Sequence, residues 1–355
     1  MDEASVFSGS ATEQTTGVDP LTATRPYLDQ TSVNETTPLI SDQVAGVFFL
    51  VICYTLVSTS SLGVIANIAN VLVFWKMGFT VVCNISFFCL SLSDLFCSGF
   101  LILQGMSIQP NVARLDLKIS VKDITTYMCP IFWCISAFGS WVTALISMER
   151  CCCIVLPLKV QRIFTHRTVK GLILGQVIYQ VATGTPHYFA MKLEFTTLPT
   201  TNETKLILNG SAYNHDLGVL SQVLSYSIPT FLCFILVIIG TIFLVVSMKR
   251  SLKFRSSATS KDRTLNTDKE LKIIKTIIFI SIIYIVCLFP NVIVFFSSLI
   301  FPTFRVFNPY LSSLYGIVLG FTLIFQSISM AVNIFVYLKL SSAYRKTFYK
   351  LFQRG

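Results

Sequence analysis

The sequence predicts an all-α fold, a seven-transmembrane-helix bundle with a short amphipathic eighth helix. Three observations support this prediction. Hydrophobic residues make up 53% of the 355 positions and charged residues only 12%, with a mean hydropathy of +0.70, whereas soluble domains carry about 25% charged residues. The apolar residues gather into seven separate runs, and Lys and Arg concentrate between alternate runs. Such a chain belongs in a lipid bilayer.

Each of the seven runs reaches the roughly 20 residues that a helix needs to cross the hydrocarbon layer. The fourth run is the least apolar, because Gln176, Gln180 and His187 interrupt it. Leaving it out would place both ends of the chain on the same side of the membrane. The predicted spans are 45–75, 81–105, 125–156, 168–190, 219–248, 272–300 and 310–338.

The segments that flank the spans divide the chain into three parts. Residues 1–42 are rich in Thr, Ser, Asp and Glu, which predicts a disordered extracellular tail before the seven-span domain of 45–338. In residues 339–355, Lys and Arg alternate with apolar side chains. This pattern predicts an amphipathic helix on the inner membrane surface and a short cytoplasmic tail.

The distribution of basic residues predicts the orientation of the chain. The net charge is +10, but Lys and Arg lie between runs too apolar for a soluble core, so the expected neighbour is anionic membrane lipid and not nucleic acid. Twenty of them fall in the segments between and after alternate spans, and seven in the others. Because basic residues favour the cytoplasmic side, we expect a multi-pass plasma-membrane protein with an extracellular N-terminus.

Glycosylation sequons agree with this orientation. Asn34, Asn202 and Asn209 each begin an Asn-X-Ser/Thr motif in a segment that the charge distribution places outside the cell. Asn84 also begins such a motif, but it lies in the second span, out of the glycosylating enzyme's reach. We therefore expect glycans on the first three.

Few charged or amide side chains lie within the spans, and each is a functional candidate because such groups are costly in hydrocarbon. Asp94 lies in the middle of the second span, and Glu149 and Arg150 lie at the inner end of the third. The other marked positions are the amides of Asn67 and Asn333, the ring of Tyr337, and the prolines Pro157, Pro229 and Pro290.

In this combination and order, these residues resemble the rhodopsin-like, or class A, family of G-protein-coupled receptors, over all seven spans. The resemblance implies a receptor that transmits the binding of an extracellular peptide or small chemosensory molecule to a cytoplasmic heterotrimeric G protein. It implies that carboxylates hold Arg150 in the inactive state. Asn67, Asp94 and Asn333 would form a polar core able to bind sodium, and Tyr337 would help to rearrange the inner half.

Two carboxylates are candidates to hold Arg150. Glu149 is its neighbour in sequence, and Glu270 lies twenty residues before Pro290, where many family members carry the opposing acid. A planar guanidinium binds carboxylates through charge-assisted hydrogen bonds. We expect both acids to restrain Arg150.

The sequence also departs from the family pattern. The family usually has Pro at the position of Ile334, Trp at that of Leu288 and Tyr at that of Cys151. In the fourth span, Gln176 lies near the position of the family's usual Trp. No Cys lies between Cys153 and Cys233, so the usual disulfide between the third span and the second outer loop is expected to be absent. The pattern resembles divergent invertebrate receptors of chemosensory and peptide type, with a less constrained outer loop.

Single positions narrow the ligand class. Phe132 stands where amine receptors of the family carry Asp, and Ser327 stands where opsins carry the Lys that binds retinal. Neither an amine nor retinal is therefore expected as the ligand. The outer segments have a formal charge of −5, which favours a neutral or basic ligand. We expect aromatic and amide side chains to line the pocket, namely Trp133, Tyr226, Asn291 and Gln326.

Three other protein classes remain as alternatives. A seven-helix ligand-gated channel similar to insect odorant receptors would have its N-terminus inside the cell. The distribution of basic residues predicts the opposite orientation. A transporter would carry a relay of ionisable groups near the midplane, where only Asp94 qualifies. An enzyme is the least favoured class, because no metal-ligand cluster and no set of nucleophile, His and acid occurs.

Overall fold

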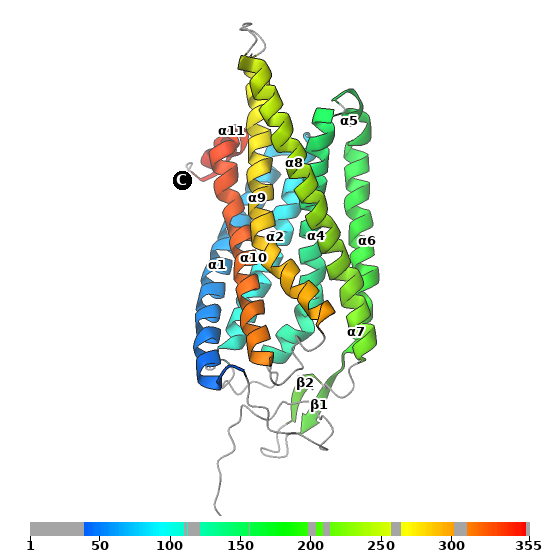
Figure 1. The fold of residues 1–355 in the computed structure, drawn as a ribbon, viewed down its shortest axis with the longest axis vertical. Helices are drawn as coiled ribbons and strands as arrows, with labels where there is room; N and C mark the ends of the chain where they lie inside the picture. The colour runs from blue at the N-terminus through cyan, green and yellow to red at the C-terminus, as the bar shows by residue number, and fades with distance from the viewer. Residues whose placement is uncertain are drawn as a thin grey trace, which may run out of the picture. The chain divides into compact units, whose positions relative to one another are not determined.

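Long helices make up most of the chain (Figure 1). The computed structural model describes residues 39–109, 112, 121–155, 157–197, 204–208, 214–256, 264–301 and 311–352. The long helices are α1 (Asp42–Met77), α2 (Val82–Ile108), α4 (Val121–Val155), α6 (His166–Ala190), α8 (Ile228–Ser256), α9 (Thr264–Ile300) and α10 (Ser312–Leu340). Shorter elements are α5 (Pro157–Ile163), α7 (His215–Gln222), the π-helix η3 (Val223–Ser227), α11 (Ser342–Phe352) and the strands β1 (Leu193–Thr197) and β2 (Thr204–Leu208).

All seven predicted spans are confirmed as helices, and six of them are long and apolar enough to cross a membrane. The exception is α6, the fourth span, which falls short in hydropathy. Its burial pattern explains why. Leu174, Ile178 and Val181 are about 60% exposed, whereas Gln180 and His187 are buried. The polar residues that dilute its hydropathy therefore face the bundle, and the apolar ones face outward.

The same inside-out pattern holds for the other helices. Ser60, Asn67 and Asp94 are buried, while Ile65 and Phe335 are each 67% exposed. In water this distribution would cost free energy, but in a bilayer the lipid solvates the apolar outer surface and the polar groups find partners between helices. The described bundle is therefore built for a membrane.

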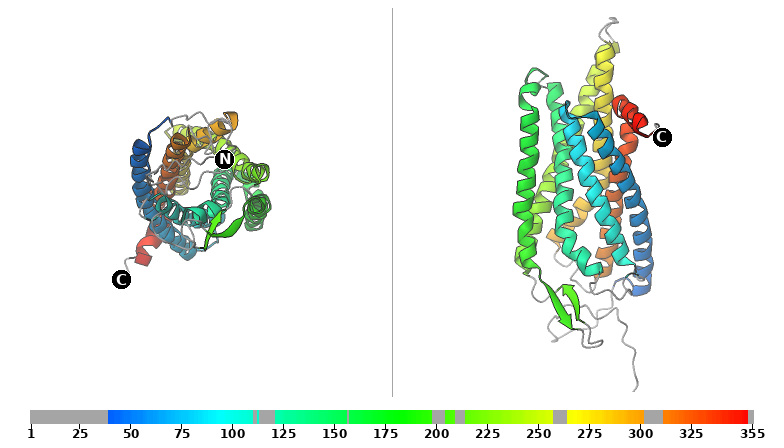
Figure 2. Two further views of the ribbon diagram at one scale, coloured as in Figure 1. Left: turned by 90° about the horizontal axis from the view of Figure 1, so that it is seen from below. Right: turned by 180° about the vertical axis from the view of Figure 1, so that it is seen from behind.

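The helices form a ring (Figure 2) in which α1 packs against α2 and α10, and α9 packs between α8 and α10. Helix α4 lies at the centre of the packing, because it contacts α2, α6, α8 and α9. The core has two apolar clusters. One includes Phe74, Phe87 and Tyr337, and the other includes Leu56 and Phe132. Asp94 lies in α2 between the residues that α2 contributes to each cluster, so a polar layer separates them.

The prolines of the fifth and sixth spans lie where the helices depart from regular geometry. Pro229 has no N–H to donate and its ring crowds the preceding turn. The wide π turn of η3 directly precedes it, with the Ile228 N–H bonded to the Val223 carbonyl five residues earlier. Helix α9 changes direction in its second half (Figure 1), as expected for a helix that contains Pro290.

The segment between α6 and α7 contains a feature that the all-helical prediction missed. β1 and β2 pair in antiparallel fashion, with Leu193 opposite Leu208. Cys129 is a free thiol. In place of a covalent link, the Leu208 backbone N–H donates to the Asp123 carboxylate in the first turn of α4. A charge-assisted hydrogen bond thus attaches the hairpin to α4, and the expectation that the loop is less constrained than one held by a disulfide stays a prediction.

Two of the short helices, α5 and α11, lie at the opposite end from the hairpin. Figure 1 places α5 and α11 at one end of the bundle and β1 and β2 at the other. This separation arises because successive connections between spans lie at alternate ends of the bundle. The amphipathic helix predicted in residues 339–355 is confirmed as α11, and α5 is an unpredicted helix between α4 and α6.

Close packing of α1 on α2 depends on glycine. A Cβ at Gly63 would lie 2.6 Å from the Ser98 Oγ and 3.3 Å from the Ser98 Cβ, whereas one at Gly46 would meet nothing within 4 Å. Gly63→Val should therefore destabilise the bundle by about 1–3 kcal/mol through overpacking. Thermal unfolding of purified protein, followed with a dye that reacts with the exposed thiols, measures the change. Gly46→Val in the same helix is the control, and equal losses for both variants would contradict the packing explanation.

Candidate functional site

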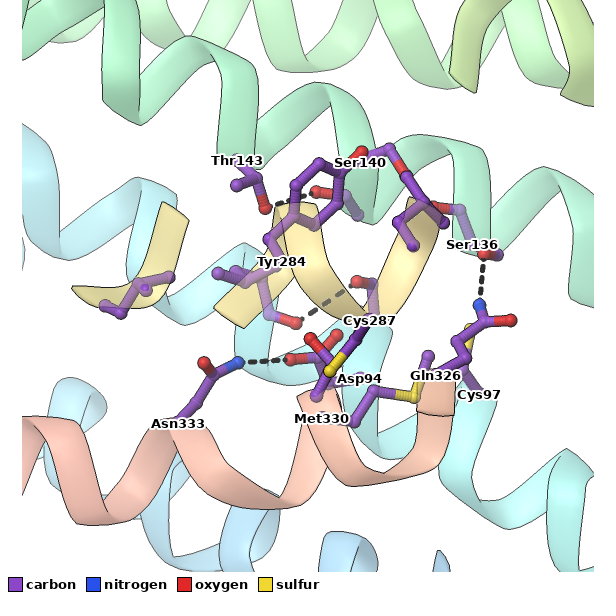
Figure 3. A pocket seen from close by; sticks show the side chains of 16 residues that line it. Asp94, Cys97, Ser136, Ser140, Thr143, Tyr284, Cys287, Gln326, Met330 and Asn333 are labelled. Carbon is purple, nitrogen blue, oxygen red and sulfur yellow. Dashed lines mark hydrogen bonds between the residues drawn. The ribbon is translucent and has the colours of Figure 1, made fainter. Parts of the chain in front are cut away.

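A polar cavity lies in the layer between the two apolar clusters (Figure 3). It has a volume of about 50 Å³, room for a few water molecules. Asn333 in α10 donates through Nδ2 to Asp94 Oδ2 in α2 at 3.0 Å, and both residues are buried. The structure therefore brings two of the three predicted polar-core residues together. Other oxygen-bearing side chains in the wall are Ser93, Ser136, Ser140, Thr143, Tyr284, Gln326 and Ser329.

This set of groups fits a hard cation. Asp94 supplies a carboxylate, the surrounding hydroxyls and amides supply neutral oxygens, and hard cations prefer such ligands. Gln326 Oε1 is buried and has no hydrogen-bond partner among the described residues, so an acceptor remains at the cavity wall. Asp94, Asn333 and Gln326 are thus the groups that would hold a sodium ion, whose charge would offset that of the carboxylate.

Asn67, the third predicted polar-core residue, belongs to a neighbouring network. Its Nδ2 donates to the Gly63 carbonyl at 2.9 Å and to the Met330 carbonyl of α10 at 3.1 Å. Its Oδ1 accepts from Asn70 Nδ2 at 3.1 Å. Because Met330 also lines the cavity, Asn67 borders the Asp94 site through the α10 backbone.

The four predicted ligand contacts lie in one network nearer the outer end. Asn291 of α9 donates to the Tyr226 hydroxyl at 2.6 Å, and the Trp133 and Tyr226 rings lie 6.5 Å apart. Gln326 donates through Nε2 to Ser136 Oγ at 2.6 Å, and Ser136 also hydrogen-bonds Tyr226. The network thus joins α4, η3, α9 and α10.

Two features of this outer network were missed from the sequence. Ser136 links its two halves, but a single hydroxyl in a span carries no signal of its own. His187 packs edge-on against Trp133, with ring centroids 5.5 Å apart, and its Nδ1 lies 3.1 Å from the Gly218 carbonyl. The sequence marks His187 only as a residue that weakens the fourth span.

Near the C-terminal end of α4, Arg150 contacts a carboxylate and a thiol. Its Nη2 lies 3.4 Å from Glu149 Oε1 and also donates to Cys83 Sγ in α2. The Cys83 thiol in turn donates to Glu149 Oε2 at 3.4 Å. A neutral thiol has one donor and can accept, so it fits between the two charges. Cys83 is a contact that sequence analysis missed, because thiols in apolar spans usually serve as packing residues.

The other predicted residues of the inner switch have different outcomes. The backbone of Glu270 lies in α9, but its side chain lies outside the described part, so its pairing with Arg150 stays a prediction. Tyr337 is buried, and its hydroxyl has no hydrogen-bond partner among the described residues. The sequons at Asn34, Asn202 and Asn209 also lie outside the described residues.

Hydroxyl groups on α4 connect the outer and inner sites. Ser136, Ser140, Thr143 and Ser147 are all buried and recur at the spacing of one helix face. Ser147 Oγ lies 3.2 Å from Ser281 Oγ of α9, and Ser140 lines the cavity together with Tyr284 of α9. Polar side chains of α4 thus run from the cavity toward Arg150.

The cavity leads to a prediction about sodium. Asp94→Asn removes the charge that a cation needs and keeps a side chain of the same shape. The wild-type protein should unfold at a higher temperature in sodium chloride than in equal potassium chloride, by about 2–4 °C for each kcal/mol of binding free energy, and Asp94→Asn should lose this difference. Asp216→Asn, in the first turn of α7, is the control. Equal wild-type midpoints in the two salts would count against a sodium site.

Comparison with known proteins agrees with this geometry. A family model described as 7 transmembrane receptor (rhodopsin family) matches residues 70–337, well over half of the chain. The curated proteins searched include no match. The matched stretch contains Asp94, Arg150 and Asn333, and it gives no support to a channel or a transporter. The chain is a multi-pass membrane protein and belongs to the rhodopsin family of seven-transmembrane receptors.

Proposed function

We propose that this receptor lies in the plasma membrane with its N-terminus outside, binds a neutral or basic ligand in the network around Tyr226, and activates a heterotrimeric G protein through Arg150. The observation that carries the proposal is the run of polar side chains along α4. It begins at Ser136 beside the outer network, continues through Ser140 and Ser147, and ends at Arg150. Energetic coupling between two distant sites can travel through packed side chains and hydrogen bonds of this kind.

The chemistry of the outer network sets the ligand class. Tyr226, Asn291 and Gln326 offer hydrogen bonds without charge, and Trp133 offers an aromatic face. A ligand that competes for these bonds would separate Asn291 in α9 from Tyr226 in η3. A small chemosensory molecule or a peptide side chain with hydrogen-bonding groups and an apolar body fits this role.

Movement of α9 is the proposed link between the two sites. The contact of Ser147 with Ser281 holds α9 against α4. Side-chain hydrogen bonds between membrane helices are worth about 0.6 kcal/mol on average. Such a contact is weak enough for ligand binding to overcome and specific enough to define a resting position.

The inner cluster supplies the output. Arg150 is held by Glu149 and Cys83 in the arrangement described, and the family resemblance adds Glu270 from α9. Displacement of α9 would remove Glu270 and leave Arg150 free to turn toward a partner protein. The guanidinium then offers its remaining donors to the G protein.

Arg150→Ala should abolish coupling at unchanged surface expression, because it removes the group offered to the G protein. Glu270→Ala and Cys83→Ala should each raise basal signalling, since each removes one restraint on Arg150. Partly exposed pairs are worth about 0–1 kcal/mol, so the rise should be at most about fivefold. Calcium and cAMP responses in cells that express promiscuous G proteins measure both effects.

Two further variants make this experiment specific to the cluster. Cys83→Ser keeps a donor and an acceptor and should stay near wild type, while Cys89→Ala in the same helix controls for the loss of a thiol. A fully active Arg150→Ala at equal surface levels would overturn the proposed output. Unchanged basal signalling in both Glu270→Ala and Cys83→Ala would contradict the proposal that these two residues restrain Arg150.

The proposed orientation predicts glycans at Asn34, Asn202 and Asn209, since all three fall on the side opposite the basic loops. Glycosidase treatment of surface-labelled protein should increase its mobility on a gel. The triple Asn→Gln variant should migrate like the treated wild type and Asn84→Gln like the untreated one. A triple variant that migrates with untreated wild type would argue against an extracellular N-terminus with these glycans.

A further inference from the structure

Helix α11 is anchored to the bundle by one buried tyrosine. Tyr344 is the buried residue of α11 and is 0% exposed, whereas its neighbours Arg345 and Lys346 face outward. Its ring packs on Phe74 of α1 and Tyr337 of α10, with centroid distances of 5.3 Å in both cases. An isolated helix of this length is marginal in water, so α11 depends on such contacts for its position.

The hydroxyl of this tyrosine begins a relay of hydrogen bonds into the polar layer. Tyr344 donates to Asn70 Oδ1 at 2.6 Å, and Asn70 Nδ2 donates to Asn67 Oδ1 at 3.1 Å. Asn67 Nδ2 donates to the Met330 carbonyl in α10 at 3.1 Å. Asn67 and Asn70 are fully buried.

Both polar atoms of the Asn70 side chain take part in this relay, because Oδ1 accepts from Tyr344 of α11 and Nδ2 donates to Asn67. Losing the Tyr344 bond would leave a buried acceptor on Asn70 without its partner, which is costly in hydrocarbon. The relay therefore couples the position of α11 on the bundle to the position of α10 at Met330.

Tyr337 makes this coupling relevant to signalling. Its ring is held by Phe74, Phe87 and Tyr344, yet its buried hydroxyl has no partner among the described residues. An unsatisfied buried hydroxyl favours any arrangement in which it finds a partner. Asn70 fixes the position of the Tyr344 ring, and this ring is one of the contacts that hold Tyr337 in the arrangement described.

We propose that the hydrogen bond between Tyr344 and Asn70 couples α11 to the polar layer and restrains Tyr337, so that α11 is a moving part of the receptor's switch. Tyr344 and Asn70 are positioning residues, since they act through Asn67 and Tyr337. The signalling half of this inference rests on the proposed function. The mechanical half, the anchoring of α11 to Asn67 through Asn70, stands on the contacts alone.

Tyr344→Phe tests the inference because it keeps the ring and removes only the hydroxyl. Hydrogen exchange of the purified receptor in lipid nanodiscs should become faster in residues 342–352. Basal nucleotide exchange on added heterotrimeric G protein should rise about threefold, the equivalent of about 0.6 kcal/mol. Tyr349→Phe, at an exposed position of the same helix, should change neither measurement.

A double-mutant cycle with Asn70→Ala separates the relay from simple loss of packing. If the two residues act through one bond, the double variant should exceed neither single variant in α11 exchange. Additive effects, or wild-type exchange in Tyr344→Phe, would overturn the anchor. Faster α11 exchange with unchanged nucleotide exchange would overturn the coupling. If even wild type activates no G protein, the proposed function fails and the signalling half with it, while hydrogen exchange still decides on the anchor.

Discussion

The need to satisfy every buried polar group without water governs this bundle. Asp94 and Asn333 bond to each other, Asn67 and Asn70 bond to each other and to neighbouring helices, and Ser147 meets Ser281. The pair of Asp94 and Asn333 lies between two apolar clusters in which the helices pack against one another. In lipid, apolar packing gives little directional preference, whereas hydrogen bonds fix which helix faces which. The polar layer therefore sets the register of the bundle.

The same layer contains the groups that are only partly satisfied. Gln326 Oε1 and the Tyr337 hydroxyl are buried without partners among the described residues. A fully satisfied network would hold one arrangement firmly, while unsatisfied groups lower the cost of an alternative in which they are paired. The residues that fix the bundle and those that permit its rearrangement are thus neighbours in one layer.

The sequence was sufficient to predict the spans, because twenty or more apolar residues in a row have few other uses. It also predicted that Asp94 and Asn333 are functional residues, since each is costly in hydrocarbon, and the structure pairs them. Asn70 and Tyr344 escaped prediction. An amide near a helix end and a tyrosine in a basic amphipathic segment are both ordinary, and only the fold brings them within 2.6 Å. Cys83 was missed because a thiol gives no charge signal.

The hairpin of the second outer loop is attached to α4 by the bond from Leu208 to Asp123, while Cys129 keeps its thiol. A disulfide opens only through exchange with another thiol and stays closed for as long as the surroundings are oxidising. A hydrogen bond breaks and reforms on the timescale of loop motion. The link between the hairpin and α4 can therefore break and reform without an exchange of thiols, and this bond does not depend on the redox state of the surrounding fluid.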